Sequence, residues 1–229
     1  MHGARAAHFH CLWTASLLVA CSAAGGPVHR TLAECKQRIV PRPVDSVSAR
    51  WLTTSELCVS PRTAGAVAGL SGHEAGTGMS GPTLPSRCIG IACKKTRFYD
   101  RWLELRKQAT NKEAQRLLHH RDPVVRAVFA AEAIKRGLIS RRLLYPLLSD
   151  TTELKRFSGC TWAEVTIWKH TLTALSAAPK TVRTPLLVDI ASDRELLPDV
   201  RRFARFILAH GPQVPLRIGP GVGAVDRRN

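Results

Sequence analysis

The regular spacing of helix starts after Lys95 constrains the fold of this chain more than any other sequence feature. Thr110 and Glu113 fit the capping box, in which a threonine hydroxyl and a glutamate carboxylate bond the backbone amides that the first helical turn leaves unpaired. Thr161 and Glu164 repeat this pattern 51 residues later. Two helix starts of the same kind predict a helical domain in the second half of the chain.

Other residues mark a third start and the stops. Asp122 can cap a helix that begins with Pro123, where the missing N–H costs nothing. A further capping pattern at Ser192 would place Pro198 inside a helix, so the last helix is expected to begin at Pro198 instead. The stops are Gly137, Pro179 and Gly211. The predicted helices cover residues 98–108, 112–120, 123–136, 139–149, 162–177, 181–191 and 198–209.

Apolar residues within these helices recur at three- to four-residue spacing, as Val200, Phe203 and Ile207 do. The connections between the helices are short. Helices joined by short turns are antiparallel neighbours, stacked in a bundle or a solenoid. The predicted fold class is therefore all-α.

A repeated segment resembles the HEAT repeat. The run Asp-Pro-Val-Val-Arg that ends at Arg126 is similar to the second helix of such a repeat, and Leu-Pro-Asp-Val-Arg, ending at Arg201, is a second copy. Val125, Val165 and Val200 are separated by 40 and 35 residues, which are repeat-sized steps, although the middle copy is degenerate. The resemblance implies a short HEAT-like superhelix of about three helix pairs over residues 96–211. It also implies that Arg126 and Arg201 brace a capping aspartate of their own or a neighbouring unit.

The segment before this domain, residues 21–95, is rich in Gly, Pro, Ser and Thr, so long regular elements are not expected in it. Residues 64–85 in particular have the composition of a flexible linker. The alternative is a small module tied by disulfides. The tail, residues 212–229, is expected to be disordered.

The first 20 residues have the pattern of an export signal: Arg5, an apolar run over residues 11–20, then small residues. The run ends Leu-Val-Ala-Cys, which resembles the lipobox of bacterial lipoproteins and makes Cys21 the lipid-bearing residue. Ser22 after the cysteine would favour the outer membrane in a Gram-negative cell. Small residues from Ser22 to Ala24 leave an ordinary signal peptide as an alternative, and a misassigned start would leave the protein secreted or cytoplasmic.

The chain has seven cysteines, a number that suits an oxidising compartment. Neighbours in sequence are the expected pairs, Cys35 with Cys58 and Cys88 with Cys93, although four cysteines allow three connectivities. Cys160 is then left over. A metal site at Cys88 and Cys93 would need two more ligands at a suitable spacing, and none follows. No metal or cofactor is therefore predicted.

The formal net charge of +17 makes phosphates, anionic lipids and acidic protein surfaces the expected targets. Two basic clusters are candidate binding residues, against the alternative of a solvated face. They are Lys135, Arg136, Arg141 and Arg142 at one turn, and Arg202 and Arg205 on the last helix. Trp162 and Trp168 are six residues apart and would not share a helix face, so at least one of them is expected to be exposed.

No set of catalytic residues is found in the sequence: it lacks a nucleophile elbow, a phosphate-binding glycine loop and a metal motif. His119, His120, His170 and His210 are interpreted as polar residues at helix ends or on the surface. The predicted function is a non-enzymatic, envelope-associated HEAT-like scaffold that binds a protein partner and reaches the membrane through its lipid anchor. The alternative is a basic solenoid that binds nucleic acid, with affinity falling steeply as salt rises.

Overall fold

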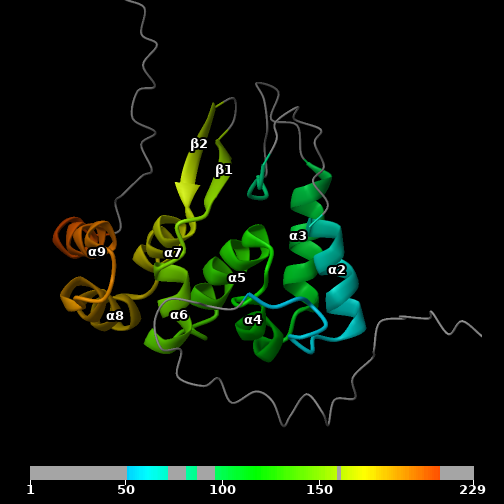
Figure 1. The fold of residues 1–229 in the computed structure, drawn as a ribbon, viewed down its shortest axis with the longest axis horizontal. Helices are drawn as coiled ribbons and strands as arrows, with labels where there is room; N and C mark the ends of the chain where they lie inside the picture. Colours follow the sequence, from blue (N-terminus) through cyan, green and yellow to red (C-terminus); the bar gives the residue numbers. More distant parts are fainter. Residues whose placement is uncertain (1–50, 72–80, 87–95, 159–160, 212–229) are drawn as a thin grey trace, which may run out of the picture.

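The structure, a computed structural model, describes residues 51–71, 81–86, 96–158 and 161–211 (Figure 1). Within these ranges the chain forms eight α-helices and one two-stranded antiparallel hairpin, so the fold is mostly helical rather than all-α. The helices are α2 (Pro61–Ser71), α3 (Arg97–Gln108), α4 (Asn111–Leu117), α5 (Pro123–Lys135), α6 (Arg141–Leu148), α7 (Ile167–Ser176), α8 (Lys180–Ser192) and α9 (Pro198–His210). The hairpin joins β1 (Glu153–Ser158) to β2 (Thr161–Thr166).

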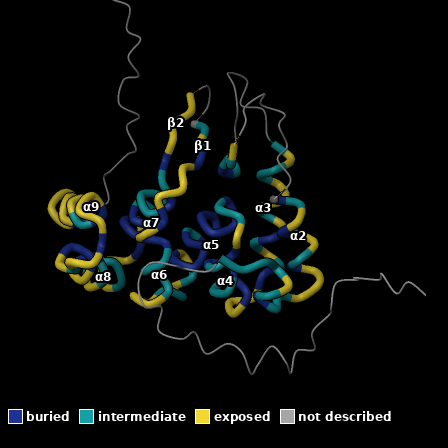
Figure 2. Tube along the Cα trace, in the orientation of Figure 1, coloured by how far each residue is buried: buried dark blue, intermediate teal, exposed yellow. Residues whose placement is uncertain are grey.

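The helices lie side by side in one row from α2 and α3 to α9 (Figure 1). Consecutive helices contact each other as the pairs α4–α5, α6–α7 and α8–α9, and the second helices of these pairs also meet, α5 with α7 and α7 with α9. Two apolar clusters fill the row. One surrounds Leu105 and Phe129, and the other surrounds Leu172 and Val200. Figure 2 shows that the buried segments lie where the helices meet.

Six of the seven predicted helices lie where the sequence placed them, with ends shifted by at most three residues. The capping box at Thr110 and Glu113 is confirmed, since each side chain bonds the backbone amide of the other residue. The stop at Gly137 is confirmed as well: its φ of 69° suits glycine, and the Leu138 N–H donates to the Ala133 carbonyl.

The predicted helix over residues 162–177 is wrong in its first part, because residues 161–166 form β2 and the helix begins at Ile167. Thr161 and Glu164 make no capping box there. Instead, β2 pairs with β1 in a register that places Val165 opposite Leu154, and both of these side chains are buried. A strand that buries an apolar cross-strand pair outcompetes a local cap. Val165 therefore does not occupy the middle helix of a repeat.

The expected linker is also partly wrong, because residues 61–71 form α2 and this helix contacts α3 and α5. Val67 and Leu70 of α2 are buried in the first apolar cluster. The Gly69 carbonyl accepts a hydrogen bond of 3.1 Å from Arg101. Gly65 and Gly69 lower the helix propensity of this segment and so hid the helix in the sequence, whereas packing against α3 and α5 stabilises it.

The residues before α2 bind to the helical row through backbone hydrogen bonds. The Leu52 N–H donates to the His119 carbonyl at 2.8 Å, and the Arg121 N–H donates to the Leu52 carbonyl at 2.7 Å. The Ser60 N–H donates to the Glu113 carboxylate at 2.7 Å. Burial opposes the charged form of Glu113, but hydrogen bonds from Ser60 and Thr110 outweigh it and lower the pKa to about 2.

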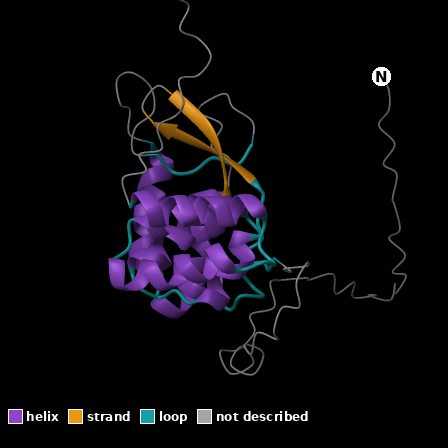
Figure 3. Cartoon of the chain, turned by 90° about the vertical axis from the view of Figure 1, so that its left-hand side faces the viewer, coloured by secondary structure: helices purple, strands orange, loops and turns teal. Residues whose placement is uncertain are grey.

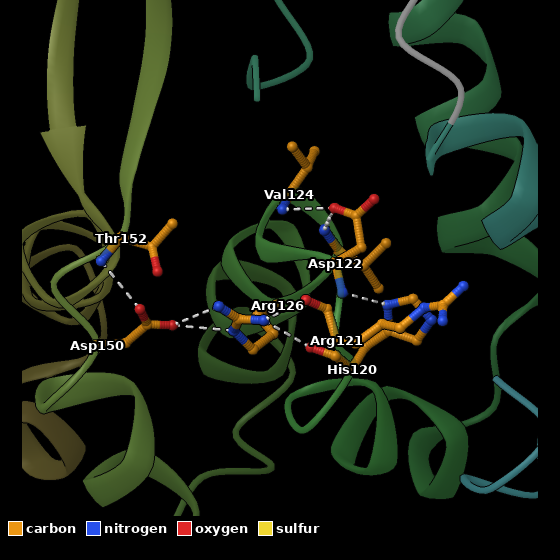
Figure 4. A network of polar contacts seen from close by, with 8 residues as sticks. His120, Arg121, Asp122, Val124, Arg126, Asp150 and Thr152 are labelled. Carbon is orange, nitrogen blue, oxygen red and sulfur yellow. Dashed lines mark hydrogen bonds and ion pairs between the residues drawn. The ribbon is translucent and has the colours of Figure 1, made fainter. Parts of the chain in front are cut away.

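An ion pair between Arg126 and Asp150 lies in the centre of this arrangement (Figure 4). Both side chains are almost completely buried, with 2% and 4% of their surface exposed. Nε and Nη2 of Arg126 both reach Oδ2 of Asp150, at 2.9 and 2.8 Å, and Oδ1 accepts from the Thr152 N–H. The Trp51 ring covers the guanidinium at 3.9 Å. The pair therefore joins α5, the end of α6 and the segment that precedes α2.

The polar atoms of Arg126 and the nearby His120 are paired by hydrogen bonds to neighbouring residues. Nη1 of Arg126 donates to the carbonyls of His120 and Arg121, both at 2.8 Å. His120 is buried, which corrects its expected place at a helix end or on the surface, and burial lowers its pKa. Its Nδ1 accepts from the Asp122 N–H, so Nε2 carries the proton of the neutral ring and donates to Thr54 at 3.0 Å.

Arg126 has a structural role, as expected, but its partner is not a capping aspartate, and Arg201 makes no comparable pair within the described residues. Arg126 braces Asp150 rather than Asp122, which caps α5 through the N–H groups of Val124 and Val125. The Nε of Arg201 is buried and meets no hydrogen-bond acceptor among the described residues. The two copies of the sequence pattern therefore differ in structure.

Replacing Asp150 by alanine should lower the free energy of unfolding by about 3–5 kcal/mol, because the Arg126 charge stays buried without its partner. The double variant R126M/D150L should lose less, since it removes both charges. Urea unfolding followed by circular dichroism measures each value, and Asp189→Ala serves as the control because Asp189 is exposed. A loss at Asp150 no larger than at Asp189 would contradict the central role of the pair.

His170 in α7 is half-buried. Its Nδ1 is buried without a hydrogen-bond partner among the described residues. Burial, together with the nearby charge of Arg156, lowers the pKa of His170 to about 4, against a weaker opposing bond to the Ala127 backbone. The folded chain therefore favours the neutral ring.

The free energy of unfolding should decrease as the pH is lowered from about 6.5 to about 4. Over this range the unfolded chain protonates His170 at its ordinary pKa, while the folded chain does not. The loss due to His170 should reach at most about 3 kcal/mol. Unfolding at pH 7 and pH 5 should show a smaller difference in His170→Asn than in the wild type. Glu113 contributes only at lower pH, below its ordinary value of 4.5. An unchanged difference in the variant would show that the ring is protonated in the folded chain.

Candidate binding surface

The predicted cation cluster between α5 and α6 does not form a free basic stripe. Arg136 donates to the carbonyls of Ala109 and Arg106, at 2.8 and 2.6 Å, and pairs with the buried Glu132 at 2.8 Å. It therefore holds the end of α3 against α5. Lys135 beside it is exposed. Arg136 is therefore a weaker candidate binding residue, since its guanidinium is engaged in these contacts.

Arg141 and Arg142 lie exposed at the start of α6. Arg141 pairs with Asp193, the residue that follows α8, and Asp193 also accepts a hydrogen bond from Tyr145. The hydrogen bond from Tyr145, with smaller contributions from Glu195 and Arg141, lowers the pKa of Asp193 despite partial burial. Arg141 therefore joins α6 to the turn between α8 and α9, which leaves it less free to bind a ligand.

The two predicted cations of α9 differ from each other. Arg202 is highly exposed, with 82% of its side chain accessible, and it pairs with Asp199 at 3.7 Å, which is itself 73% exposed. Arg205 instead donates to the Ala191 carbonyl of α8 at 3.1 Å. An exposed pair at this distance contributes little free energy. Arg202 is therefore the more available of the two candidates.

Four aromatic rings line one side of α9, and we call them the aromatic ladder: Trp168, Phe203, Phe206 and His210. Trp168 of α7 meets Phe203 edge to face at 6.0 Å between ring centroids. Phe203 stacks on Phe206 at 6.3 Å, and Phe206 stacks on His210 at 4.3 Å. The Nδ1–H of His210 donates to the Phe206 carbonyl at 2.9 Å. The ladder therefore runs along α9 from its contact with α7 to its last residue.

The centre of the ladder is open to solvent. Phe206 is 43% exposed, although it neighbours both Phe203 and His210 in the ladder. Lys169 of α7 lies 5.9 Å from the centre of the Phe203 ring. Burial on α9 is confined to Val200, Ala204 and Ile207, and Figure 2 shows the outer side of this helix as exposed.

Sequence reasoning missed the ladder because it treated Phe203 as part of the buried stripe of α9. The positions 203, 206 and 210 have the spacing i, i+3, i+7, which places three rings on one helix side. This spacing was the available signal. Trp162 is 43% exposed and Trp168 is partly buried, so the expectation that at least one of them is exposed is confirmed.

Other exposed apolar side chains lie near the end of the row. Val188 of α8 is 50% exposed, Leu197 before α9 is 40% exposed, and Leu208 on the other flank of α9 is 37% exposed. These side chains add exposed apolar surface to the α8–α9 pair.

Two parts of the sequence-based site fall outside the described residues. Cys21, Cys35, Cys88 and Cys93 all lie there, so the lipid attachment and the pairing of Cys58 stay predictions. Within the described ranges, no group of His, Cys, Asp or Glu side chains is arranged to hold a metal ion. None of the helices in those ranges is both long enough and apolar enough to cross a membrane.

The chain was compared with known proteins at the level of families, sequences and structures. No family model matches it, and comparison with curated proteins and with solved structures returns no match. The function must therefore be argued from the surface itself.

Proposed function

We propose that this protein is a non-enzymatic scaffold of the HEAT-like type that binds a protein partner through the aromatic ladder. Three consecutive helix pairs, α4–α5, α6–α7 and α8–α9, support the HEAT-like interpretation, because their second helices also contact one another in order. The hairpin between α6 and α7 is an insertion in this scheme, and Figure 3 shows it standing outside the helical layer.

The exposure of Phe206 is the observation that carries the proposal. A stacked aromatic ring that is 43% exposed on the last helix keeps apolar surface in water, and covering it releases about 25 cal/mol for each Å². Aromatic residues are enriched at the centres of protein interfaces. The ladder therefore favours a partner that brings apolar side chains of its own.

The ring geometry favours protein over nucleic acid. A nucleic-acid base stacks on an open aromatic face. Phe206 already stacks on His210 at 4.3 Å, and the Phe203 ring lies nearly parallel to it at 6.3 Å, so part of its aromatic surface is taken. Arg136 and Arg205, which could have contacted phosphates, donate to backbone carbonyls instead.

A photo-crosslinking amino acid at position 206 should capture a protein partner in cells, and the same group at position 188 should not. Val188 is the matched control because it is equally apolar and 50% exposed, but lies on α8. In a pull-down, Phe206→Asp should lose the captured partner, whereas Val188→Asp should keep it. Circular dichroism checks that both variants are folded. Capture that is independent of position 206, or nucleic acid that co-purifies only when Phe206 is intact, would contradict the proposal.

The location of the protein in the cell is proposed from its sequence. The lipobox-like run before Cys21 supports attachment to the cell envelope, where the scaffold would face a partner close to the membrane.

Mass spectrometry of the mature protein should find the chain beginning at Cys21 with a diacylglycerol thioether and an acylated amine. The variant Cys21→Ser should lose this mass and appear in the soluble fraction. Detection of a chain that retains Met1 would overturn both the lipid anchor and the oxidising compartment proposed for the cysteines.

A further inference from the structure

We propose that the partner segment bound by the aromatic ladder is an amphipathic helix whose apolar side is flanked by acidic residues. This inference rests on the proposed function and adds the chemistry of the ligand. It follows from the length of the ladder, the charges beside it and the net charge of the chain.

The length of the ladder matches a helix of two to three turns. Phe203 and His210 are seven residues apart on α9, which corresponds to roughly 10 Å along the helix axis. A second helix presents apolar side chains at the same spacing, i, i+3 or i+4, and i+7, when it lies against such a row. An apolar helix side is therefore the simplest shape that covers all the rings at once.

The charges beside the ladder favour acidic residues on the flanks of that helix. Lys169 lies against the Phe203 ring, and Arg202 precedes Phe203 on α9 with 82% of its side chain exposed. Asp199 lies 3.7 Å from Arg202, but its side chain is itself 73% exposed, so this pair compensates the Arg202 charge only weakly. Glutamate or aspartate on the partner would meet two cations that carry little compensation here, which would raise both the association rate and the specificity.

A second copy of this chain fits the surface poorly. An interface formed by two ladders would bring Lys169 and Arg202 of one copy toward those of the other. Each copy also carries a formal net charge of +17. Like charges across an interface are unfavourable, and this repulsion favours an acidic partner over self-association.

Two labelled peptides of 18 residues test the proposal directly. Both carry leucine at the same positions along one helix side, and one has glutamate at the flanking positions where the other has lysine. Fluorescence anisotropy with the full chain, folded and in low salt, measures each affinity. We expect the glutamate peptide to bind at least tenfold more tightly than the lysine peptide, and to weaken as salt rises.

Variants of the protein separate the apolar part of the site from its charges. Phe206→Asp should weaken binding of the glutamate peptide at least tenfold, and Val188→Asp should leave it unchanged. The double variant K169E/R202E should reverse the preference toward the lysine peptide, an effect that a loss of folding cannot produce.

Each remaining outcome contradicts a defined part of the proposal. Equal affinity for the two peptides, or binding of neither, overturns the acidic helix but leaves position-206 crosslinking to a protein intact. Binding of a thymidine oligonucleotide that depends on Phe206 overturns both the acidic helix and the proposed protein partner. Self-association that Phe206→Asp abolishes, measured by analytical ultracentrifugation, would assign the surface to a second copy.

Discussion

The buried pair of Arg126 and Asp150 is the interaction on which the rest of the structure depends. A guanidinium can be kept away from water only when its donors are met, and here a carboxylate, two carbonyls and the face of Trp51 meet them. Arg126 itself belongs to α5, and these groups come from the end of α6, from the turn before α5 and from the segment before α2. Satisfying one side chain therefore fixes the relative positions of four parts of the chain.

Local signals predicted most of the helices, because a cap acts within one turn. The hydroxyl of Thr110 and the carboxylate of Asp122 bond amides two or three residues away, so their effect can be seen in the sequence. Thr161 carries the same signal but lies in a strand, since Val165 is buried opposite Leu154. That choice depends on a partner strand, and a local pattern contains no information about it.

The candidate surface was less predictable than the fold. Arg136 and Arg202 look alike in sequence, yet one holds the ends of two helices and the other is exposed. Which carbonyls an arginine reaches depends on helix packing across 27 or 30 residues. The spacing of Phe203, Phe206 and His210 was visible in the sequence, but only the packed structure shows that Phe206 stays 43% exposed.

The stacking of Trp51 on Arg126 has a consequence for the order in which the chain folds. The helix pairs α4–α5 and α8–α9 join residues close in sequence, and such contacts close at a small entropic cost. Trp51 meets a residue 75 positions further along the chain. The helical row is therefore expected to assemble first, with its central charge still hydrated. Arrival of the N-terminal segment then expels that water and completes the native state.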